Sequence, residues 1–212
     1  MVEFNDVVFQ KIGITIAKLD KDTLQEIKDL VINRRHELHK DAKPTLVGAL
    51  KEEKEIPIEF LPDNFKQILQ DGLVAHVRSY VNGIKTFDIN CLGVWVNYQE
   101  KGDYNPLHEH SGDLVFVLWI KVPFNIHDER EYPSIKNSKA VSFAAGFGLV
   151  YHNPFGNLTQ EVLPVDKDWE GSLVIFNSKF SHLVYPFFTS DDVRISMSGN
   201  FSLINVTRTN TW

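Results

Sequence analysis

The chain has 212 residues, of which 43% are hydrophobic and 24% are charged. These proportions are those of a folded globular protein and exclude a disordered chain. The formal net charge is −6 and no run of Lys or Arg stands out. Nucleic acid is therefore not expected as a main partner, because duplex binding depends on clustered basic side chains. The length predicts a single domain, residues 1–212.

The cellular compartment is suggested by the cysteine content and by the N-terminus. Cys91 is the single cysteine of the sequence, so no internal disulfide can form, which is typical of the reducing cytoplasm. Residues 1–6 carry acidic side chains where a signal peptide carries positive charge. The longest apolar run, from Leu114 to Ile120, is far shorter than the ~20 residues of a membrane span. We therefore expect a cytoplasmic protein without a membrane partner.

The first part of the chain predicts two strands and a helix. Residues 4–9 and 12–19 alternate loosely between apolar and polar side chains, which is the pattern of strands. From residue 20 to residue 40 the apolar side chains recur at helical spacing, with a polar opposite face. A short acidic side chain can cap the start of such a helix, and Asp20 and Asp22 are both candidates.

A loop and a second helix are expected next. Residues 41–61 contain prolines, a glycine and the charged run 51–55, which predicts a loop with at most a short helical turn. Residues 63–81 carry an apolar stripe at helical spacing, and Asn82 and Gly83 end it. Both helices lie within residues 20–83.

From residue 87 the pattern changes to short β-like runs separated by Gly, Pro, Asn and Asp. These runs lie near 87–99, 112–123, 139–150, 158–164, 172–177, 181–187 and 193–206. Several short strands with no intervening helices predict a sandwich or barrel. The expected fold is therefore mainly β with N-terminal helices: a jelly-roll core, residues 87–206, packed against two α-helices.

Three histidines are the first candidates for chemistry. His108 and His110 are two residues apart, so in a strand both side chains point to the same face. His182 follows the predicted strand 172–177 and begins a new one. Such a group suits a metal, although two surface histidines in a polar loop remain an alternative for the pair alone.

The last predicted strand places four polar side chains on one face. They are Arg194, Ser196, Ser198 and Asn200. This face either points to water, as in an ordinary strand with one polar side, or lines the interior of the jelly-roll. A buried arginine is costly unless it is paired, and the carboxylate of a ligand is a suitable bidentate partner.

Several motifs together resemble the Fe(II)- and 2-oxoglutarate-dependent oxygenases, near their prolyl-hydroxylase-like and phage or bacterial branches. The motifs are Trp95-Val96-Asn97-Tyr98, the segment from Gly102 to His110, Ser181-His182 and the segment from Arg194 to Asn200. The similarity runs from about Trp95 to Asn205, half of the chain. It implies a double-stranded β-helix, which agrees with the predicted jelly-roll, and it implies Fe(II) with 2-oxoglutarate as cosubstrate.

The resemblance also implies roles for individual residues. His108 matches the first iron ligand and His182 the distal histidine. Arg194 matches the residue that pairs with the far carboxylate of 2-oxoglutarate, with Ser196 as a helper for the same carboxylate. The resemblance further places Tyr98, with Asn97 beside it, against the cosubstrate, although a core aromatic is an alternative for the tyrosine.

One position departs from the family pattern. The family usually has Asp or Glu two residues after the first histidine, and this chain has His110 there. A third imidazole still binds iron but leaves the site one charge more positive than a carboxylate does. Asp113 could reach the metal if the loop folds back. We predict His108, His110 and His182 as ligands, with Asp113 as the rival.

The implied activity is that of a dioxygenase that hydroxylates a substrate and converts 2-oxoglutarate to succinate and CO2. Two alternatives stay open: a cupin-like three-histidine metalloprotein without 2-oxoglutarate, and a non-catalytic jelly-roll binding module. The substrate is expected to be a small molecule or a peptide. The identity of the substrate depends on loops such as 41–61 and 124–138, whose sequences do not indicate what they bind.

Overall fold

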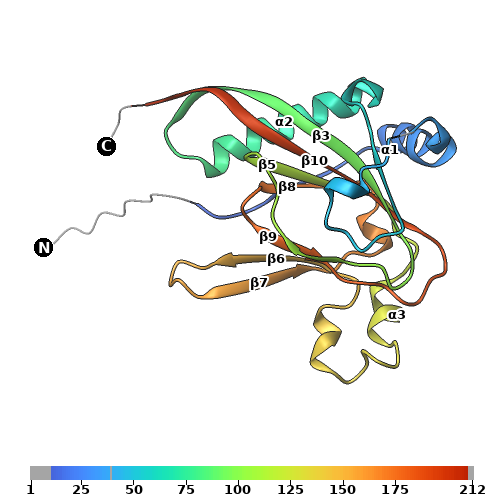
Figure 1. Ribbon diagram of the computed structural model, residues 1–212. Helices are drawn as coiled ribbons and strands as arrows, with labels where there is room; N and C mark the ends of the chain where they lie inside the picture. Colours follow the sequence, from blue (N-terminus) through green and yellow to red (C-terminus); the bar gives the residue numbers. More distant parts are fainter. Residues whose placement is uncertain (1–10, 39, 210–212) are drawn as a thin grey trace, which may run out of the picture.

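Two antiparallel sheets face each other in the computed structural model, which describes residues 11–38 and 40–209 (Figure 1). The larger sheet contains, in spatial order, β1 (Thr15–Lys18), β8 (Ser172–Asn177), β5 (Leu114–Lys121), β10 (Arg194–Arg208), β3 (Ile84–Gln99) and β2 (Glu52–Glu55). The smaller sheet contains β4 (Asn105–His108), β9 (Ser181–Val184), β6 (Phe147–His152) and β7 (Leu158–Leu163).

The helices lie mainly outside the larger sheet. Helices α1 (Lys21–Lys28) and α2 (Asp63–Tyr80) lie beside this sheet, on the side away from the smaller one, and α3 (Ile126–Arg130) lies between β5 and β6 in the chain (Figure 1). Short turns complete the set: a π-helical turn at Asp29–Asn33 and 3-10 turns at Arg35–Glu37, Lys43–Thr45, Ile58–Phe60, Lys139–Ser142 and Lys167–Trp169. None of the helices in the described part of the chain combines the length and the apolar character that a bilayer span requires.

Strand β5 explains how the layers are held together. Its side chains alternate between two cores: Phe116 and Leu118 pack with α1 and α2, whereas Val117 and Trp119 pack between the two sheets. Because both faces of the strand are covered, its sequence is a continuous apolar run and does not alternate between apolar and polar residues. The cavity described below lies between the sheets, at the edge of the second core.

The predicted fold class is confirmed: the protein is mainly β, a jelly-roll core with two N-terminal helices. The predicted helix 63–81 is α2, and the strands expected from residue 158 onward are all present. Asp20 caps the first helix, since its Oδ1 accepts a hydrogen bond from the Thr23 backbone N–H at 2.9 Å. The predicted strand 4–9 lies outside the described residues.

Four expectations needed correction. The β region was expected to contain no helices, but α3 lies within the expected loop 124–138. The helix predicted for residues 20–40 is α-helical only to Lys28, after which π and 3-10 turns continue to Glu37. The strand expected from residue 139 begins only at Phe147, since residues 139–142 form a 3-10 turn. The expected loop 41–61 contains β2, which pairs with β3. That charged strand becomes part of the cavity wall.

Candidate metal and cosubstrate site

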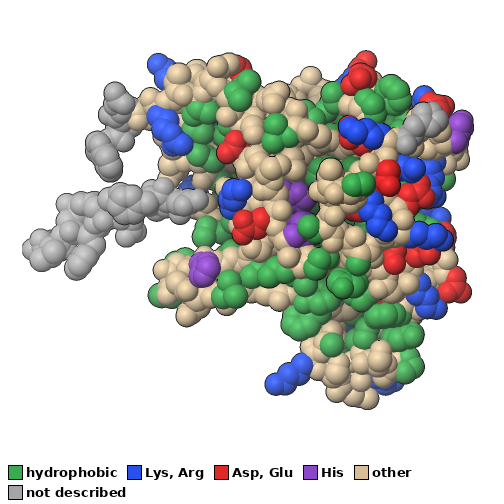
Figure 2. Space-filling view, viewed as in Figure 1, with side chains coloured by type: hydrophobic (Ala, Val, Ile, Leu, Met, Phe, Trp, Pro, Cys, Tyr) green, Lys and Arg blue, Asp and Glu red, His purple; other side chains and the backbone are tan. Residues whose placement is uncertain are grey.

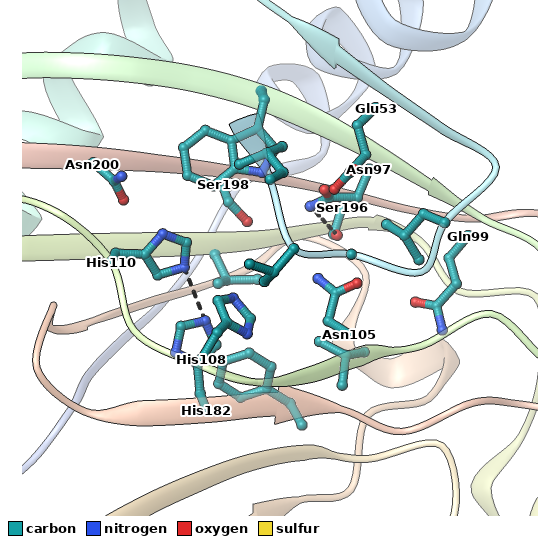
Figure 3. A pocket seen from close by; sticks show the side chains of 18 of the residues that line it. Glu53, Asn97, Gln99, Asn105, His108, His110, His182, Ser196, Ser198 and Asn200 are labelled. Carbon is teal, nitrogen blue, oxygen red and sulfur yellow. Dashed lines mark hydrogen bonds between the residues drawn. The ribbon is translucent and has the colours of Figure 1, made fainter. Parts of the chain in front are cut away.

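A cavity of about 280 Å³ lies between the two sheets. Three histidines stand at one end and Gln99 at the other, with polar side chains of β2, β3, β4 and β10 between them (Figure 3). The segment 45–50 and Trp95, Val117, Trp119, Phe147 and Val184 complete the wall together with Arg194. Histidine side chains are visible in the middle of the face shown in Figure 2. The cavity therefore joins a cluster of imidazoles to a guanidinium.

The structure brings His108, His110 and His182 together. Strands β4 and β9 pair directly, and His108 and His182 are partners across this pair. One ring nitrogen of each histidine lies within 4.8 Å of the corresponding atoms of the other two. The Nε2 atoms of His110 and His182 are 3.1 Å apart. Three side chains separated by up to 74 positions in the chain thus share one point in space.

Backbone carbonyls fix the orientation of two of these rings. Nδ1 of His108 donates to the Pro106 carbonyl at 2.7 Å, and Nδ1 of His182 donates to the Phe180 carbonyl at 3.1 Å. With Nδ1 protonated, the lone pair of each ring is on Nε2, which is the usual arrangement of a metal-binding histidine. The His110 ring stacks on Trp95, with 5.5 Å between the ring centroids.

The three imidazoles are electrically neutral at pH 7. Burial lowers the pKa of His108, and it lowers that of His110 to about 4 with a further contribution from His108. Burial and the two neighbouring rings hold the pKa of His182 well below its ordinary value. Because only a deprotonated nitrogen binds a metal, the cluster is ready for a divalent cation without first losing protons. Imidazole ligands suit iron, zinc, copper and nickel.

The structure does not bring Asp113 to this cluster. Its Oδ2 accepts a hydrogen bond from the Leu203 backbone N–H at 2.8 Å, and its own N–H donates to the Phe201 carbonyl. The carboxylate is thereby tied to β10, away from the three histidines. In this arrangement the local backbone pairing of the turn before β5 fixes the position of Asp113.

Arg194 is buried at the opposite end of the cavity, with 2% of its surface exposed. Its Nε and Nη2 donate to Oε1 of Gln99, Nη1 donates to the Ala145 carbonyl and Nη2 to the Tyr185 carbonyl. These bonds occupy four of the five N–H groups. Burial lowers the pKa of Arg194 to about 9 against the opposing effect of the Glu129 carboxylate, so the guanidinium stays charged at pH 7.

The polar face of β10 lines the cavity, as the alternation predicts. Ser196, Ser198 and Asn200 follow Arg194 along the wall, whereas Ile195 and Met197 pack on the helix side. Asn97 faces Ser196 across the strand pair, and its Nδ2 donates to the Ser196 hydroxyl oxygen at 3.3 Å. Asn97 therefore lies in the cavity.

The prediction for Tyr98 is corrected. Its hydroxyl donates to the Val31 carbonyl at 2.7 Å, and its ring packs under the Arg35 guanidinium on the helix side of the sheet. Successive side chains of a strand point to opposite faces, so Asn97 in the cavity places Tyr98 outside it. The alternative for this residue, a core aromatic, is what the structure shows.

Sequence reasoning missed Gln99, Asn105 and Glu53. Gln99 follows Trp95 and Asn97 at every second position, a spacing that could have found it. Asn105 lies on β4, three residues before His108. Glu53 lies in a charged run, a pattern that predicts exposure to solvent, yet only 1% of its surface is exposed. No local signal distinguishes it from Glu52 or Glu55.

Comparisons with known proteins agree with this geometry. Residues 93–200 match the family described as "Putative 2OG-Fe(II) oxygenase". A prolyl-4-hydroxylase from Pseudomonas putida has 18% identity and a TM-score of 0.54, over 90% of this chain and 92% of that one. An oxidoreductase of the 2OG-Fe(II) oxygenase family from Burkholderia pseudomallei has 14% identity and a TM-score of 0.56, over 90% and 84%.

A third similar structure carries ligands. HygX from Streptomyces hygroscopicus, with nickel, 2-oxoglutarate and hygromycin B bound, has 11% identity and a TM-score of 0.54, over 90% of this chain and 83% of that one. No protein of curated function matches the chain in sequence. The family match covers half of the chain, and the similar structures share its fold. The protein belongs to the 2OG-Fe(II) oxygenases, a family that uses Fe(II) and 2-oxoglutarate.

Proposed function

We propose that the protein is an Fe(II)- and 2-oxoglutarate-dependent dioxygenase that hydroxylates its substrate and releases succinate and CO2. His108, His110 and His182 would bind the metal, and Arg194 would bind the far carboxylate of 2-oxoglutarate. One observation carries this proposal: neutral imidazoles converge at one end of a cavity that has a buried guanidinium at the other end.

The histidine cluster fits a divalent metal that keeps open coordination positions. Three protein ligands leave room for a bidentate 2-oxo acid and one further small molecule. When bound, Fe(II) supplies the activation of dioxygen that no protein side chain can provide. The Pro106 and Phe180 carbonyls hold the rings of His108 and His182 in place, so the protein contributes orientation before the metal arrives.

The other end of the cavity fits a carboxylate. One N–H of Nη1 of Arg194 is left for a ligand, and Ser196 can add a second donor. Asn97 donates to the Ser196 oxygen, so the serine hydroxyl hydrogen is free to point to a carboxylate. A charge-assisted hydrogen bond in a buried pocket is stronger than the same bond in water.

The substrate is proposed to be a small molecule or a peptide. HygX has hygromycin B bound, and a prolyl hydroxylase from Trichoplax adhaerens, with 14% identity and a TM-score of 0.53, is in complex with a peptide fragment. Both kinds of ligand are thus bound by proteins that share this fold. The residues that would select between them are those of the cavity wall, which includes the segment 45–50.

A second candidate is a three-histidine metalloprotein that acts without 2-oxoglutarate. It is favoured by His110, which stands where family members usually have a carboxylate. It leaves the buried Arg194 without a ligand, and for this reason it ranks second.

Anaerobic titration tests the proposal. Protein is titrated with Fe(II) and then with 2-oxoglutarate, and the visible spectrum is recorded after each addition. A metal-to-ligand charge-transfer band that appears only with 2-oxoglutarate supports the dioxygenase. Metal binding without the band supports the three-histidine metalloprotein, and no metal binding supports a non-catalytic binding module.

A further inference from the structure

Four buried oxygen atoms lack a hydrogen-bond partner among the described residues, and all four belong to side chains that line the cavity. They are Oε2 of Glu53 and Oδ1 of Asn97, Asn105 and Asn200. A buried acceptor without a partner is destabilising, so such atoms are rare unless a ligand or water satisfies them. Their concentration in one cavity indicates a ligand that donates hydrogen bonds.

Three of these side chains converge on one place. Glu53 and Asn97 are direct partners in the β2–β3 pair, so both project from the same face of the sheet. A β-carbon added to Gly48 would lie 2.8 Å from Oε1 of Glu53 and 2.9 Å from Oδ1 of Asn105. Glu53, Asn97 and Asn105 are thus gathered on the Gln99 side of the histidines (Figure 3), and Gly48 lies close to Glu53 and Asn105.

The Glu53 carboxylate determines the sign of charge of a ligand that can bind among these three side chains. An amide can present either its oxygen or its nitrogen, whereas an ionised carboxylate only accepts hydrogen bonds. The neighbours of Glu53 on β2 have partners, since Glu52 pairs with Arg35 and Glu55 with Lys40. Glu53 has neither an ion pair nor a hydrogen bond to its Oε2 within the described residues. A carboxylate buried in this way is stabilised either by protonation or by a positive partner, and a positive ligand can supply the second.

We propose that Glu53, together with Asn97 and Asn105, forms a substrate subsite for a guanidinium or primary ammonium group. The subsite rests on the proposed function, because it places the substrate in the cavity shared with the metal and 2-oxoglutarate. Burial raises the pKa of Glu53 to about 7, against the opposing effect of the Lys43 charge. A bound cation favours the ionised form, so the acid and the substrate stabilise each other.

Two probes of the same shape test the charge preference. Butylguanidinium and butylurea differ in charge but little in size. Each is titrated by calorimetry into anaerobic protein loaded with Fe(II) and 2-oxoglutarate, and again into metal-free protein. We expect butylguanidinium to bind about tenfold or more tightly than butylurea in both forms, since a hydrogen bond to a charged group contributes about 1.5–3 kcal/mol.

Three variants test whether the preference for butylguanidinium over butylurea arises at this subsite. Glu53→Gln should abolish the difference between the probes and leave Fe(II) and 2-oxoglutarate affinities within about twofold of the parent. Glu52→Gln is the matched control, since Glu52 is the preceding residue and lies outside the cavity, and it should keep the full difference. Gly48→Ala keeps the carboxylate but places a methyl group among the three side chains, and it should weaken butylguanidinium binding severalfold.

The outcomes that overturn the subsite are distinct from those that overturn the dioxygenase. Equal binding of the two probes, binding of neither, or an unchanged preference in Glu53→Gln refutes the subsite. Loss of 2-oxoglutarate binding in Glu53→Gln assigns the residue to the cosubstrate instead. If Glu53→Gln does not fold, as judged by circular dichroism, the test uses Gly48→Ala. Unchanged butylguanidinium binding in that variant refutes the subsite. Failure of the parent protein to bind Fe(II) with 2-oxoglutarate refutes the function, while metal-free titrations still judge the subsite.

Discussion

Gln99 holds Arg194 through a single oxygen atom. The two residues are direct partners in the β3–β10 pair, and Oε1 of Gln99 accepts from both Nε and Nη2 of the guanidinium. The Gln99 amide is itself fixed, because its Nε2 donates to the Asp103 carbonyl. A neutral amide therefore orients the arginine without cancelling its charge, so the charge remains available to a ligand.

This relationship predicts the effect of Gln99→Glu. The new carboxylate would form an ion pair with Arg194 and compete with the carboxylate of 2-oxoglutarate. We expect the affinity for 2-oxoglutarate to fall about tenfold or more, with Fe(II) affinity changed less than about twofold. Anaerobic calorimetry measures both. Gln70→Glu, the same change on the exposed face of α2, is the control and should behave as the parent. Unchanged 2-oxoglutarate binding in Gln99→Glu would refute the assignment of Arg194.

Arg194 itself should affect the cosubstrate far more than the metal. Arg194→Ala is expected to weaken 2-oxoglutarate binding by about tenfold to a hundredfold while Fe(II) binding stays near that of the parent. Arg194→Lys keeps the charge but loses the forked geometry, so its affinity should be intermediate. Equal losses of both ligands, or no loss of either, would contradict the assignment. Thermal unfolding is the necessary control, because Arg194→Ala also leaves the Ala145 and Tyr185 carbonyls without their donor.

Glu53 should make stability depend on pH. Its folded pKa is raised to about 7 from the ordinary 4.5, so the folded protein binds more protons than the unfolded chain between these values. The free energy of unfolding contributed by this group therefore falls as the pH rises through that window, by on the order of 2 kcal/mol. Glu53→Gln removes this decline. The histidines have an opposite effect, because their lowered pKa values make stability rise with pH, so the difference between the two proteins isolates Glu53.

Urea unfolding of both proteins, in the absence of metal and at pH 5 and pH 8, measures this contribution. We expect the free energy of unfolding of Glu53→Gln, taken relative to that of the parent, to be higher at pH 8 than at pH 5. Parallel stability curves across this range would mean that the Glu53 carboxyl is solvated in solution.

Patterns local to one strand were readable from the sequence. The face of β10 that carries Arg194 and Ser196 follows from alternation alone, and so does the common direction of His108 and His110. The jelly-roll was predictable because a series of short β runs has few other arrangements, although the same pattern did not show the short helix α3. The ligand roles of the histidines stay a prediction, although their meeting in space agrees with it.

Features set by contacts between distant segments were not readable. Glu53 looks solvated because its neighbours are charged, and only the pairing of β2 with β3 carries it into the cavity. Tyr98 was placed against the cosubstrate by analogy with its distance from His108, whereas the direction of its side chain depends on which face of β3 meets the helices. Alternation shows that Asn97 and Tyr98 point in opposite directions, but it does not show which of them points inward.

The metal ligands are the central claim, and comparing His110→Ala with Asp113→Asn in anaerobic Fe(II) titrations tests them most directly. Asp113→Asn preserves an oxygen that can accept from the Leu203 N–H, so the turn before β5 should stay folded. We expect His110→Ala to lose about a hundredfold or more in Fe(II) affinity, while Asp113→Asn binds Fe(II) as tightly as the parent. Loss of Fe(II) binding in Asp113→Asn with retention in His110→Ala would contradict the three-imidazole site.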